Sequence, residues 1–559
     1  MDTVKIFCEN TGAHINVPMG STLKSVAPSN GGILAALVDN KLKALDYKVI
    51  NPQNIRFIDY SHPDGRRTYI RSLCFVLQKV VREMFPDKVL AIDYALPSGL
   101  YCELREKTMM EDGRPRVYFM TDEEIEAVHQ RMKQIIDADL PFVKTVLPHD
   151  EAVRIFETNS QPEKARLLES LGRFNYNVYW LDGLADKFYG PLAPSTGCLT
   201  IFGLAGFNDG FILQYPMDGN PGKVLPMKRQ SKIATALKEH SDWCAIMGVS
   251  GVGSLNSKVL SGGAVDLINL SEALHERKYA EIANQIYARR GSVKIVFIAG
   301  PSSSGKTSTS KRLAIQCRIL GLNPKVIELD NYFVDRELTP RDENGEYDFE
   351  SLGAMDLDFL GQQLNDLLDG KEVEIPRFDF KEGKRYFKGD MMQLHEKDIL
   401  IMEGIHALNP AMIPGVDASK VFRVYASALT SLSIDENNNI STSDNRLLRR
   451  MIRDNRTRGI VPEETIMRWQ SVRRGENRNI FPYQENADAL FNSAHIFELP
   501  VLKYYAEPLL RRISPSSPAY TEATRLLKFL DYIVALSPSE IAAIPPTSIL
   551  REFIAGQTL

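Results

Sequence analysis

The sequence has few cysteines, and their spacing excludes the two kinds of site that cysteines usually build. Six cysteines are spread over 559 residues, and no two of them form a C-x-x-C pair. This spacing suggests neither a zinc ribbon nor a disulfide framework. We therefore assign the cysteines no structural metal and expect the chain to fold in a reducing compartment.

A long apolar run and an excess of one charge are also lacking. No uninterrupted apolar stretch approaches the roughly 20 residues of a membrane helix. The opening MDTVKIFCEN lacks the basic-then-apolar pattern of a signal peptide. The 67 basic and 71 acidic residues give a net charge of -4, so nothing attracts the whole chain to nucleic acid or membrane. We expect a cytoplasmic protein without membrane contact.

A phosphate-binding loop stands slightly past the middle of the chain. The apolar run VKIVFIAG (293–300) predicts a buried strand, GPSSSGKT (300–307) fits G-x-x-x-x-G-K-[ST] at every fixed position, and a helical pattern follows. In such a loop, backbone N–H groups and the helix N-terminus face phosphate oxygens. Lys306 would neutralise the β- and γ-phosphates, and the Thr307 hydroxyl would ligate Mg²⁺. The residues expected to bind the nucleotide phosphates are Gly300, Pro301, Ser302, Ser303, Ser304, Gly305, Lys306, Thr307 and Ser308. A chance match of a serine-rich turn is the disfavoured alternative.

Two later strands are predicted to end in carboxylates that suit phosphoryl transfer. Residues 323–330 read as a strand ending in Asp330, and DILIMEG (398–404) reads as one ending in Glu403. Functional groups gather at the carboxyl ends of strands in a parallel sheet. Asp330 can accept the proton of an attacking hydroxyl, and Glu403 suits the orientation of Mg²⁺ or its water shell. A helix-capping or surface role is the plainer alternative for Asp330.

The stretch RLLRRMIRDNRTRG (446–459) predicts an arginine-rich helix. At helical spacing Arg446, Arg449, Arg450 and Arg453 cannot all be buried. One interpretation is a solvated basic helix. The favoured one is a lid that closes cations over the transferring phosphoryl group and keeps water out.

Residues 290–505 resemble the uridine kinase and phosphoribulokinase family of P-loop kinases. The resemblance is carried in order by GPSSSGKTS, LDNYF, YDFESLGAMD, IPRFDFKEGKR, ILIMEGIHAL and RLLRRMIRDNRTRG. It implies an α/β kinase fold with a parallel sheet flanked by helices. It also implies transfer of the γ-phosphoryl group of ATP to a primary hydroxyl of a ribose-like acceptor. By the same resemblance Asp330 is the base, Glu350 holds the ribose hydroxyls, and the lid and acceptor side include Arg450, Arg453 and Arg458.

The acceptor segment keeps some of that family's groups and lacks others. The retained groups, which are expected to contact the acceptor, are Phe378, Asp379, Phe380 and Arg385. Uridine kinases carry a base-reading histidine where this chain has Gly383, and Ile460 replaces a lid arginine. The loss of both side chains should weaken discrimination among nucleoside bases, because a site that forms hydrogen bonds with its substrate strongly rejects analogues that lack the matching groups. Uridine or cytidine remains the favoured acceptor, with Glu382, Lys384 or another domain reading the base. Another ribose-like alcohol, such as a sugar phosphate, is the alternative.

The first half of the chain resembles parts of tRNA synthetases. Residues 1–60 alternate like a small sheet with one helix and resemble a TGS domain, which is α+β. Residues 61–225 resemble the editing-type domain of threonyl- and alanyl-tRNA synthetases through REMFPDKVLAIDYALPSGLYCEL, TDEEIEAVHQRMKQII and YGPLAPSTGCL. That family's site uses three histidines and a cysteine. Because Arg71, Phe75, Phe188 and Leu192 stand at the aligned positions, we predict no editing activity and assign no metal.

Other polar groups in this half suggest no second site. Three histidines match no ligand spacing and are interpreted as isolated surface residues: His62, His129 and His149. A local basic cluster would suit RNA or a nucleotide phosphate, although a solvated face is the preferred interpretation: Arg66, Arg67 and Arg71.

The length predicts about three or four domains. We expect a TGS-like domain at 1–60, a degenerate editing-type domain at 61–225, a linker and helix at 226–289, the kinase domain at 290–505, and a helical tail at 506–559. Whether the tail packs on the kinase or on another subunit of a homo-oligomer stays open. The rival function is an RNA-binding or tRNA-sensing protein in which the P-loop domain is a nucleotide-dependent switch.

Overall fold

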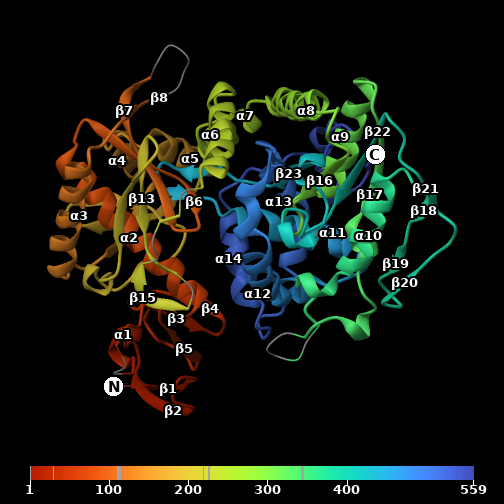
Figure 1. Ribbon diagram of the computed structural model, residues 1–559. Helices are drawn as coiled ribbons and strands as arrows, with labels where there is room; N and C mark the ends of the chain where they lie inside the picture. The colour runs from red at the N-terminus through yellow and green to blue at the C-terminus, as the bar shows by residue number, and fades with distance from the viewer. Residues whose placement is uncertain are drawn as a thin grey trace.

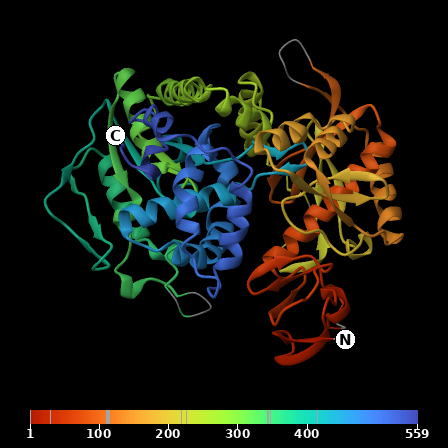
Figure 2. The same ribbon diagram turned by 180° about the vertical axis from the view of Figure 1, so that it is seen from behind.

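The chain folds into two lobes, with a small module attached below one of them (Figures 1 and 2). The computed structural model describes residues 2–28, 31–109, 115–217, 219–224, 227–228, 230–341, 345, 347–413 and 415–559. Among these residues no helix combines the length and apolar character that crossing a bilayer requires.

The N-terminal module is a five-stranded sheet in the order β2-β1-β5-β3-β4. Only β1 and β5 run parallel, and the other neighbours are antiparallel. Val4, Ile6 and Leu23 are buried in its core. This is the small sheet with one helix that the sequence predicts. Its elements are β1 (Thr3–Cys8), β2 (Ala13–Pro18), α1 (Leu23–Val26), β3 (Ala35–Val38), β4 (Lys41–Lys43) and β5 (Asn54–Ile58).

In the second region, α2 and α3 pack on an antiparallel sheet of order β12-β13-β7-β6, and β8 pairs with β7. A capping box begins α3 (Asp122–Asp137), since the Thr121 N–H donates to Glu124 Oε2 at 2.9 Å and the Glu124 N–H donates to Thr121 Oγ1 at 3.2 Å. A smaller sheet has the order β11-β10-β9. The elements are α2 (Pro63–Met84), β6 (Lys88–Leu96), β7 (Gly99–Met109), β8 (Pro115–Tyr118), α3 (Asp122–Asp137), β9 (Val143–Pro148), α4 (His149–Thr158), α5 (Pro162–Leu171), β10 (Asn175–Leu181), β11 (Leu184–Asp186), β12 (Gly203–Phe207), β13 (Gly210–Gln214), β14 (Pro216–Met217) and β15 (Asn220–Val224).

The second lobe is built on a parallel five-stranded sheet of order β17-β22-β16-β23-β26. Apolar residues cover both faces, since Val296 and Ile298 of β16 pack into one core with α8 and α9, while Ile295 and Phe297 pack into another with α10. A strand buried on both faces explains the continuous apolar runs of the sequence. The strands are β16 (Ile295–Ala299), β17 (Asn323–Glu328), β22 (Asp398–Glu403), β23 (Val421–Ser427) and β26 (Ala489–Asn492).

The remaining elements surround this sheet and join the lobes. The helices are α6 (Ser231–Ile246), α7 (Val252–Leu260), α8 (Ala264–Ala288), α9 (Lys306–Ile319), α10 (Leu357–Leu368), α11 (Thr442–Arg458), α12 (Pro462–Asn479), α13 (Glu498–Leu510), α14 (Tyr520–Leu530), α15 (Pro538–Ala542) and α16 (Arg551–Ile554). The short strands are β18 (Val373–Glu374), β19 (Arg377–Asp379), β20 (Lys384–Tyr386), β21 (Met391–Met392), β24 (Ser433–Asp435) and β25 (Asn438–Asn439). The tail helices pack with α11, α12 and α13 in one hydrophobic core, so the tail lies on the second lobe of its own chain.

A hairpin of the second lobe, β24–β25, inserts into the first lobe. The Ile92 N–H donates to the Glu436 carbonyl at 2.9 Å, and Asn437 Nδ2 donates to the Leu90 carbonyl at 3.1 Å. A cavity of about 910 Å³ lies beside this hairpin and is lined by residues of both lobes. The hairpin fixes the lobes to each other through hydrogen bonds to backbone carbonyl groups.

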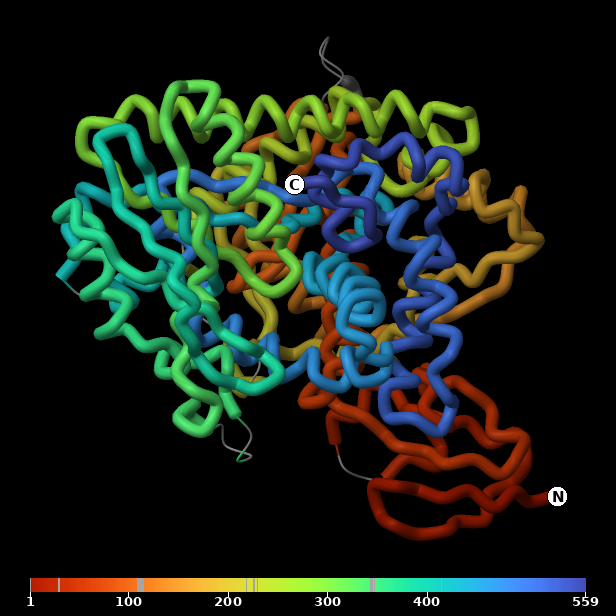
Figure 3. The backbone as a smooth tube through the Cα atoms, turned by 90° about the vertical axis from the view of Figure 1, so that its right-hand side faces the viewer, coloured from red at the N-terminus to blue at the C-terminus, as the bar shows by residue number. Residues whose placement is uncertain are grey.

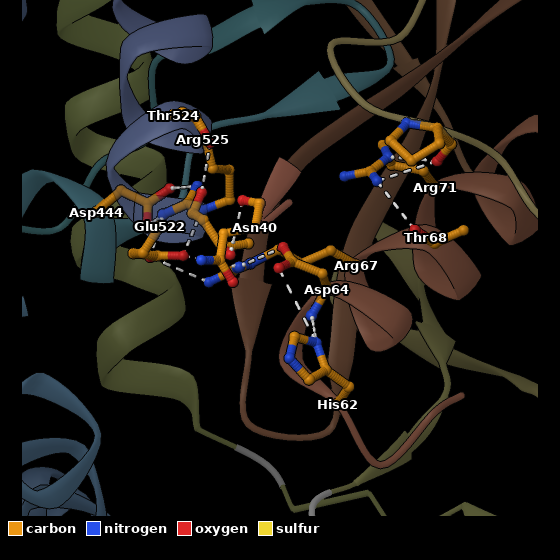
Figure 4. A network of polar contacts seen from close by, with 12 residues as sticks. Asn40, His62, Asp64, Arg67, Thr68, Arg71, Asp444, Glu522, Thr524 and Arg525 are labelled. Atoms are coloured by element: carbon orange, nitrogen blue, oxygen red, sulfur yellow. Dashed lines mark hydrogen bonds and ion pairs between the residues drawn. The ribbon is translucent and has the colours of Figure 1, made fainter. Parts of the chain in front are cut away.

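A network of charges forms a second link between the lobes (Figure 4). Arg67 of α2 donates to Asp64 at 2.8 Å and to Glu522 of α14 at 3.0 Å. Arg525 donates to Glu522 at 2.6 Å and to Asp444, in the first turn of α11, at 2.7 Å. Burial alone would raise the pKa of Glu522, but Arg525 and Arg67 hold it far below its ordinary value.

These contacts correct the interpretation of the basic cluster as a solvated face. Arg67 is paired with carboxylates of both lobes. Arg71 is only 8% exposed and donates to the Pro191 carbonyl at 3.0 Å. Arg66 donates to the Ser61 carbonyl at 3.1 Å. The sequence does not reveal this pairing because Glu522 and Pro191, which bind Arg67 and Arg71, are distant in the sequence.

Candidate active site

The phosphate loop lies between β16 and α9, as its motif predicts. Gly300 follows the last residue of β16, and a Cβ atom there would lie 1.9 Å from the Ala426 carbonyl oxygen of the neighbouring strand. Only glycine fits this approach. Ser303 has a φ of 57°, a left-handed conformation that is costly for a residue with a side chain. The loop is therefore held in a fixed curl at the carboxyl edge of the sheet.

The predicted phosphate and magnesium ligands meet at the start of α9. The Thr307 hydroxyl donates to Glu403 Oε1 at 2.5 Å, and Lys306 Nζ donates to the Pro301 carbonyl at 3.3 Å. Burial raises the pKa of Glu403 to about 7, while Lys306 favours its charged form and Asp330 opposes it. A hydroxyl beside a carboxylate is the oxygen donor set that Mg²⁺ prefers, so these residues fit the ion.

Asp330 and Glu350 complete the cluster of carboxylates around Lys306. Burial raises the pKa of Asp330, which Lys306 opposes and the nearby Glu328 reinforces. Burial also raises the pKa of Glu350 to about 7, with Glu476 adding to the rise and Arg450 opposing it. A buried carboxylate of raised pKa is a better proton acceptor, because its ionised form is less stabilised. The sequence-predicted acidic groups thus form one site.

The interpretation of α11 as a solvated basic helix is wrong for its first arginines. Arg446 and Arg449 are 1% and 0% exposed, and each is paired with a buried carboxylate, Glu476 and Glu498 respectively. Their guanidinium groups also donate to the Ser302 and Ser303 carbonyls, at 3.1 and 3.4 Å. These buried arginines therefore hold the backbone of the phosphate loop in place.

The three arginines predicted to belong to a lid all pair with Asp454, a residue that the sequence motifs do not single out. Asp454 is 1% exposed and lies 3.2 Å from Arg450, 2.9 Å from Arg453 and 3.4 Å from Arg458. Arg450 also donates to the Ser302 hydroxyl at 2.8 Å, so this group reaches the loop directly. The only sequence signal for Asp454 is a lone acidic residue inside an arginine run. The common partner lets three like charges lie side by side.

The acceptor segment brings its aromatic residues together but uses its polar residues elsewhere. Phe378 and Phe380 have ring centroids 5.2 Å apart, and Phe333 joins them at 5.7 and 6.5 Å. Asp379 accepts the N–H groups of residues 381 and 382 and so holds a turn. Arg385 pairs with Asp356 at 2.8 Å. Of the four residues expected to contact an acceptor, Asp379 and Arg385 are thus bonded within the chain, and Phe378 and Phe380 share an aromatic cluster.

Gly383 is covered by an arginine that the sequence reading also missed. Gly383 has a φ of +70°, and a Cβ atom there would lie 2.7 Å from Arg336 Cβ and Nε. Arg336 donates to the Phe380 carbonyl at 2.5 Å. Glu382 and Lys384, the expected substitutes for the missing histidine, are both exposed. The guanidinium of Arg336 therefore occupies the space beside Gly383, the position where the family resemblance led us to expect a histidine.

The four residues that stand at the predicted editing positions lie together in the first lobe. Their side chains pack against one another or bond to the backbone. The Phe75 and Phe188 rings are 5.3 Å apart, and Leu192 packs in the same core. Arg71 is turned to the backbone of the loop carrying Pro191. His62, His129 and His149 lie on different elements, each half-buried. The four residues thus lie close together, and their side chains are an arginine, two phenylalanines and a leucine rather than the usual metal ligands.

Comparison with known proteins identifies the kinase lobe. The model of the family described as "Phosphoribulokinase / Uridine kinase family" matches residues 295–498. The uridine kinase of Macrococcus caseolyticus (strain JCSC5402) is 30% identical over 197 residues, which cover 35% of this chain and 86% of that protein. The chain belongs to the phosphoribulokinase and uridine kinase family. The resemblance inferred from the motifs is confirmed, and so is the P-loop kinase fold of the second lobe.

The first lobe is similar to a different group of proteins. The threonine–tRNA ligase of Acidovorax sp. (strain JS42) is 29% identical over 205 residues, which cover 34% of this chain and 30% of the ligase. That of Clostridium kluyveri (strain NBRC 12016) is 24% identical over 200 residues, covering 35% of this chain and 30% of the ligase. The chain thus spans less than a third of these ligases.

Among solved structures, the chain is similar to the D-glycerate 3-kinase of Cryptococcus neoformans var. grubii. That protein is 13% identical, with a TM-score of 0.21, and the match covers 46% of this chain and 87% of that one.

Proposed function

We propose that the protein is an ATP- and Mg²⁺-dependent nucleoside kinase of uridine kinase type, with uridine or cytidine as the favoured acceptor. The observation that carries the proposal is the cluster around Lys306. Asp330, Glu350 and Glu403 all lie close enough to Lys306 for it to shift their pKa values. A phosphate loop, a metal-binding carboxylate and a separate candidate base are the parts that phosphoryl transfer to an alcohol requires.

In the proposed reaction, loop N–H groups and Lys306 hold the triphosphate. Asp330 takes the proton of the 5′-hydroxyl, whose oxygen forms a bond to the γ-phosphorus as the bond to the β–γ bridging oxygen breaks and ADP leaves. Bound Mg²⁺, held by Thr307 and Glu403, would supply positive charge beside the phosphates. Glu350 orients the ribose hydroxyls, while the lid supplies positive charge through Arg450, Arg453 and Arg458. Most of this is positioning and electrostatics.

A second acceptor class is favoured by one observation, the position of Arg336 over Gly383. A guanidinium donates hydrogen bonds and accepts none, whereas histidine does both. Arg336 donates hydrogen bonds to the backbone carbonyls of Phe380 and Lys381. Its remaining N–H groups favour an acceptor rich in oxygen, such as a carbonyl edge or an anionic group. A ribose-like sugar carrying a phosphate is the alternative acceptor on this ground.

The RNA-binding switch remains the rival from another class, and the site gives it less support. The basic groups of the first lobe, Arg67 and Arg71, are already paired inside the chain. RNA binding through phosphates would show a steep dependence on salt. A binding slope near zero against log salt concentration would remove this rival.

The test is ATP consumption by the purified chain against a panel of nucleosides and sugar phosphates. Asp330→Asn serves as the control for the base, and Arg336→Ala as the control for acceptor choice. Turnover with uridine or cytidine that Asp330→Asn abolishes would support a nucleoside kinase. Turnover with a sugar phosphate that Arg336→Ala weakens selectively would support the second acceptor class. No acceptor-stimulated turnover would overturn both.

A further inference from the structure

The C-terminal segment, residues 547–559, lies against the phosphate loop and α9. Figures 1 and 3 place the C-terminus beside α9. The family match ends at residue 498, so this segment lies outside the matched kinase region. Its apolar side chains are almost fully buried: Ile549, Leu550, Phe553 and Ile554. The segment is therefore a fixed part of the kinase lobe.

The segment contacts the first turn of α9 on two sides. The Ser308 hydroxyl donates to Glu552 Oε2 at 2.5 Å and accepts from Gln557 Nε2 at 2.7 Å. Ser308 is fully buried. The Ile549 side chain fills the space beside Gly305, where a Cβ atom would lie 2.4 Å from Ile549 Cδ1. The residues immediately before and after Lys306 and Thr307 are thus both held by the tail.

The same short stretch also contacts the arginine helix. Arg456 of α11 donates to the Glu552 carbonyl at 2.8 Å and to the Phe553 carbonyl at 3.2 Å. The guanidinium of Arg449 lies 4.8 Å from the Phe553 ring centroid. Glu552 therefore accepts a hydrogen bond from α11 through its backbone carbonyl and one from α9 through its carboxylate.

We propose that Glu552 is a positioning residue for phosphate-donor binding, which acts through Ser308 on the first turn of α9. The inference rests on the proposed kinase function. The Ser308 hydroxyl has an acceptor on one side and a donor on the other, so its orientation is fixed. Without the carboxylate, a buried hydroxyl loses its acceptor, and the turn shifts or takes up water to satisfy it. The N–H groups of this turn face the donor phosphates, whose binding depends on their exact placement.

The test compares binding of ATP with Mg²⁺ by isothermal titration calorimetry in four full-length proteins: wild type, Glu552→Ala, Glu552→Gln and Glu540→Ala. We expect Glu552→Ala to weaken binding about tenfold, as the loss of a buried acceptor predicts. Glu552→Gln keeps an oxygen acceptor and should stay within about threefold of wild type. Glu540 belongs to an exposed capping box in the same tail and serves as the matched control.

Binding is measured without an acceptor, so this test is independent of turnover. A wild-type protein that binds ATP but phosphorylates nothing would contradict the proposed function and leave the inference standing. Wild-type affinity in Glu552→Ala would overturn the inference, and so would equal losses in Glu552→Ala and Glu552→Gln. If Glu552→Ala does not fold, Gln557→Ala removes the other partner of Ser308. Unchanged ATP affinity in that variant would likewise overturn the inference.

Discussion

Replacing Glu476 with glutamine removes one charge from a buried ion pair while keeping the shape of the side chain. Glu476 and Arg446 are 0% and 1% exposed, and Arg446 Nη2 donates to Glu476 Oε2 at 2.7 Å. Arg473 also lies 3.2 Å from this carboxylate. The Ser302 N–H donates to Glu476 Oε1 at 3.0 Å, a bond that an amide oxygen can still accept. Glu476→Gln therefore tests the charge and leaves the contact with the phosphate loop in place.

The expected loss of folding stability is large because the Arg446 side chain is buried and water cannot replace its lost partner. Removing one partner of a buried pair costs about 3–5 kcal/mol, since the other charge stays buried and unpaired. A typical domain has a stability of about 5–15 kcal/mol. Burial alone would raise the pKa of Glu476, but Arg446 and Arg473 hold it below its ordinary value of 4.5. A carboxylate with a lowered folded pKa stabilises the fold above its unfolded pKa and loses that contribution as pH falls through the folded value. The deficit should thus be complete at pH 7 and shrink below about pH 4.5.

Urea unfolding followed by tryptophan fluorescence measures this effect, because Trp469 lies 5.4 Å from the Arg446 guanidinium. Glu464→Gln is the matched control on the same helix. Glu464 pairs with Arg468 at 2.6 Å, but the two side chains are 41% and 64% exposed. That variant should lose less than about 0.5 kcal/mol. The reasoning is refuted if Glu476→Gln costs no more than Glu464→Gln.

Three further predictions concern the metal site, the lid and the link between the lobes. Because burial raises the pKa of Glu403 to about 7, Mg²⁺ affinity in the presence of ATP should rise up to about tenfold from pH 6 to pH 8, and a flat calorimetric titration would contradict this. Asp454→Asn should lower kcat at least about tenfold by releasing three arginines, and unchanged kcat would show that they need no common anchor. Arg67→Ala should reduce the free energy of unfolding by about 1 kcal/mol in calorimetry without changing kcat, because Arg67 is 31% exposed; a larger effect on kcat than on stability would contradict a purely structural link.

The sequence could predict the parts of the site that depend on short, local patterns. The phosphate loop needs a buried strand before it and a helix after it, and both signals lie within residues 293–319. Asp330 and Glu403 were predictable because a parallel sheet gathers its carboxyl ends at one edge. The capping box of α3 depends on two residues three positions apart. The loop and the capping box follow from patterns of a few residues, whereas the two carboxylates follow from a rule that holds for the whole sheet.

The groups that support the site could not be predicted in this way. Arg446 pairs with a carboxylate 30 positions away, and Arg449 pairs with one 49 positions away. A run of arginines looks solvated unless those partners are known, because an unpaired buried charge is costly. Arg336 escaped notice for the same reason, since its contact with Gly383 follows from a turn between separate strands. The tail contacts with Ser308 join residues 244 positions apart.

The two connections between the lobes enter the kinase lobe at neighbouring points. The hairpin β24–β25 ends at Asn439, and Asp444 lies in the first turn of α11. The hairpin thus holds the chain just before the helix that carries Arg450 and Arg453, and the charge network holds the first turn of that helix. The first lobe, whose four predicted editing positions carry one arginine and three apolar residues, therefore still has a physical consequence for the second lobe. A second lobe expressed without it loses the first-lobe partners of Glu436, Asn437 and Glu522, and the start of the arginine helix is then held through the Arg525–Asp444 pair of its own lobe.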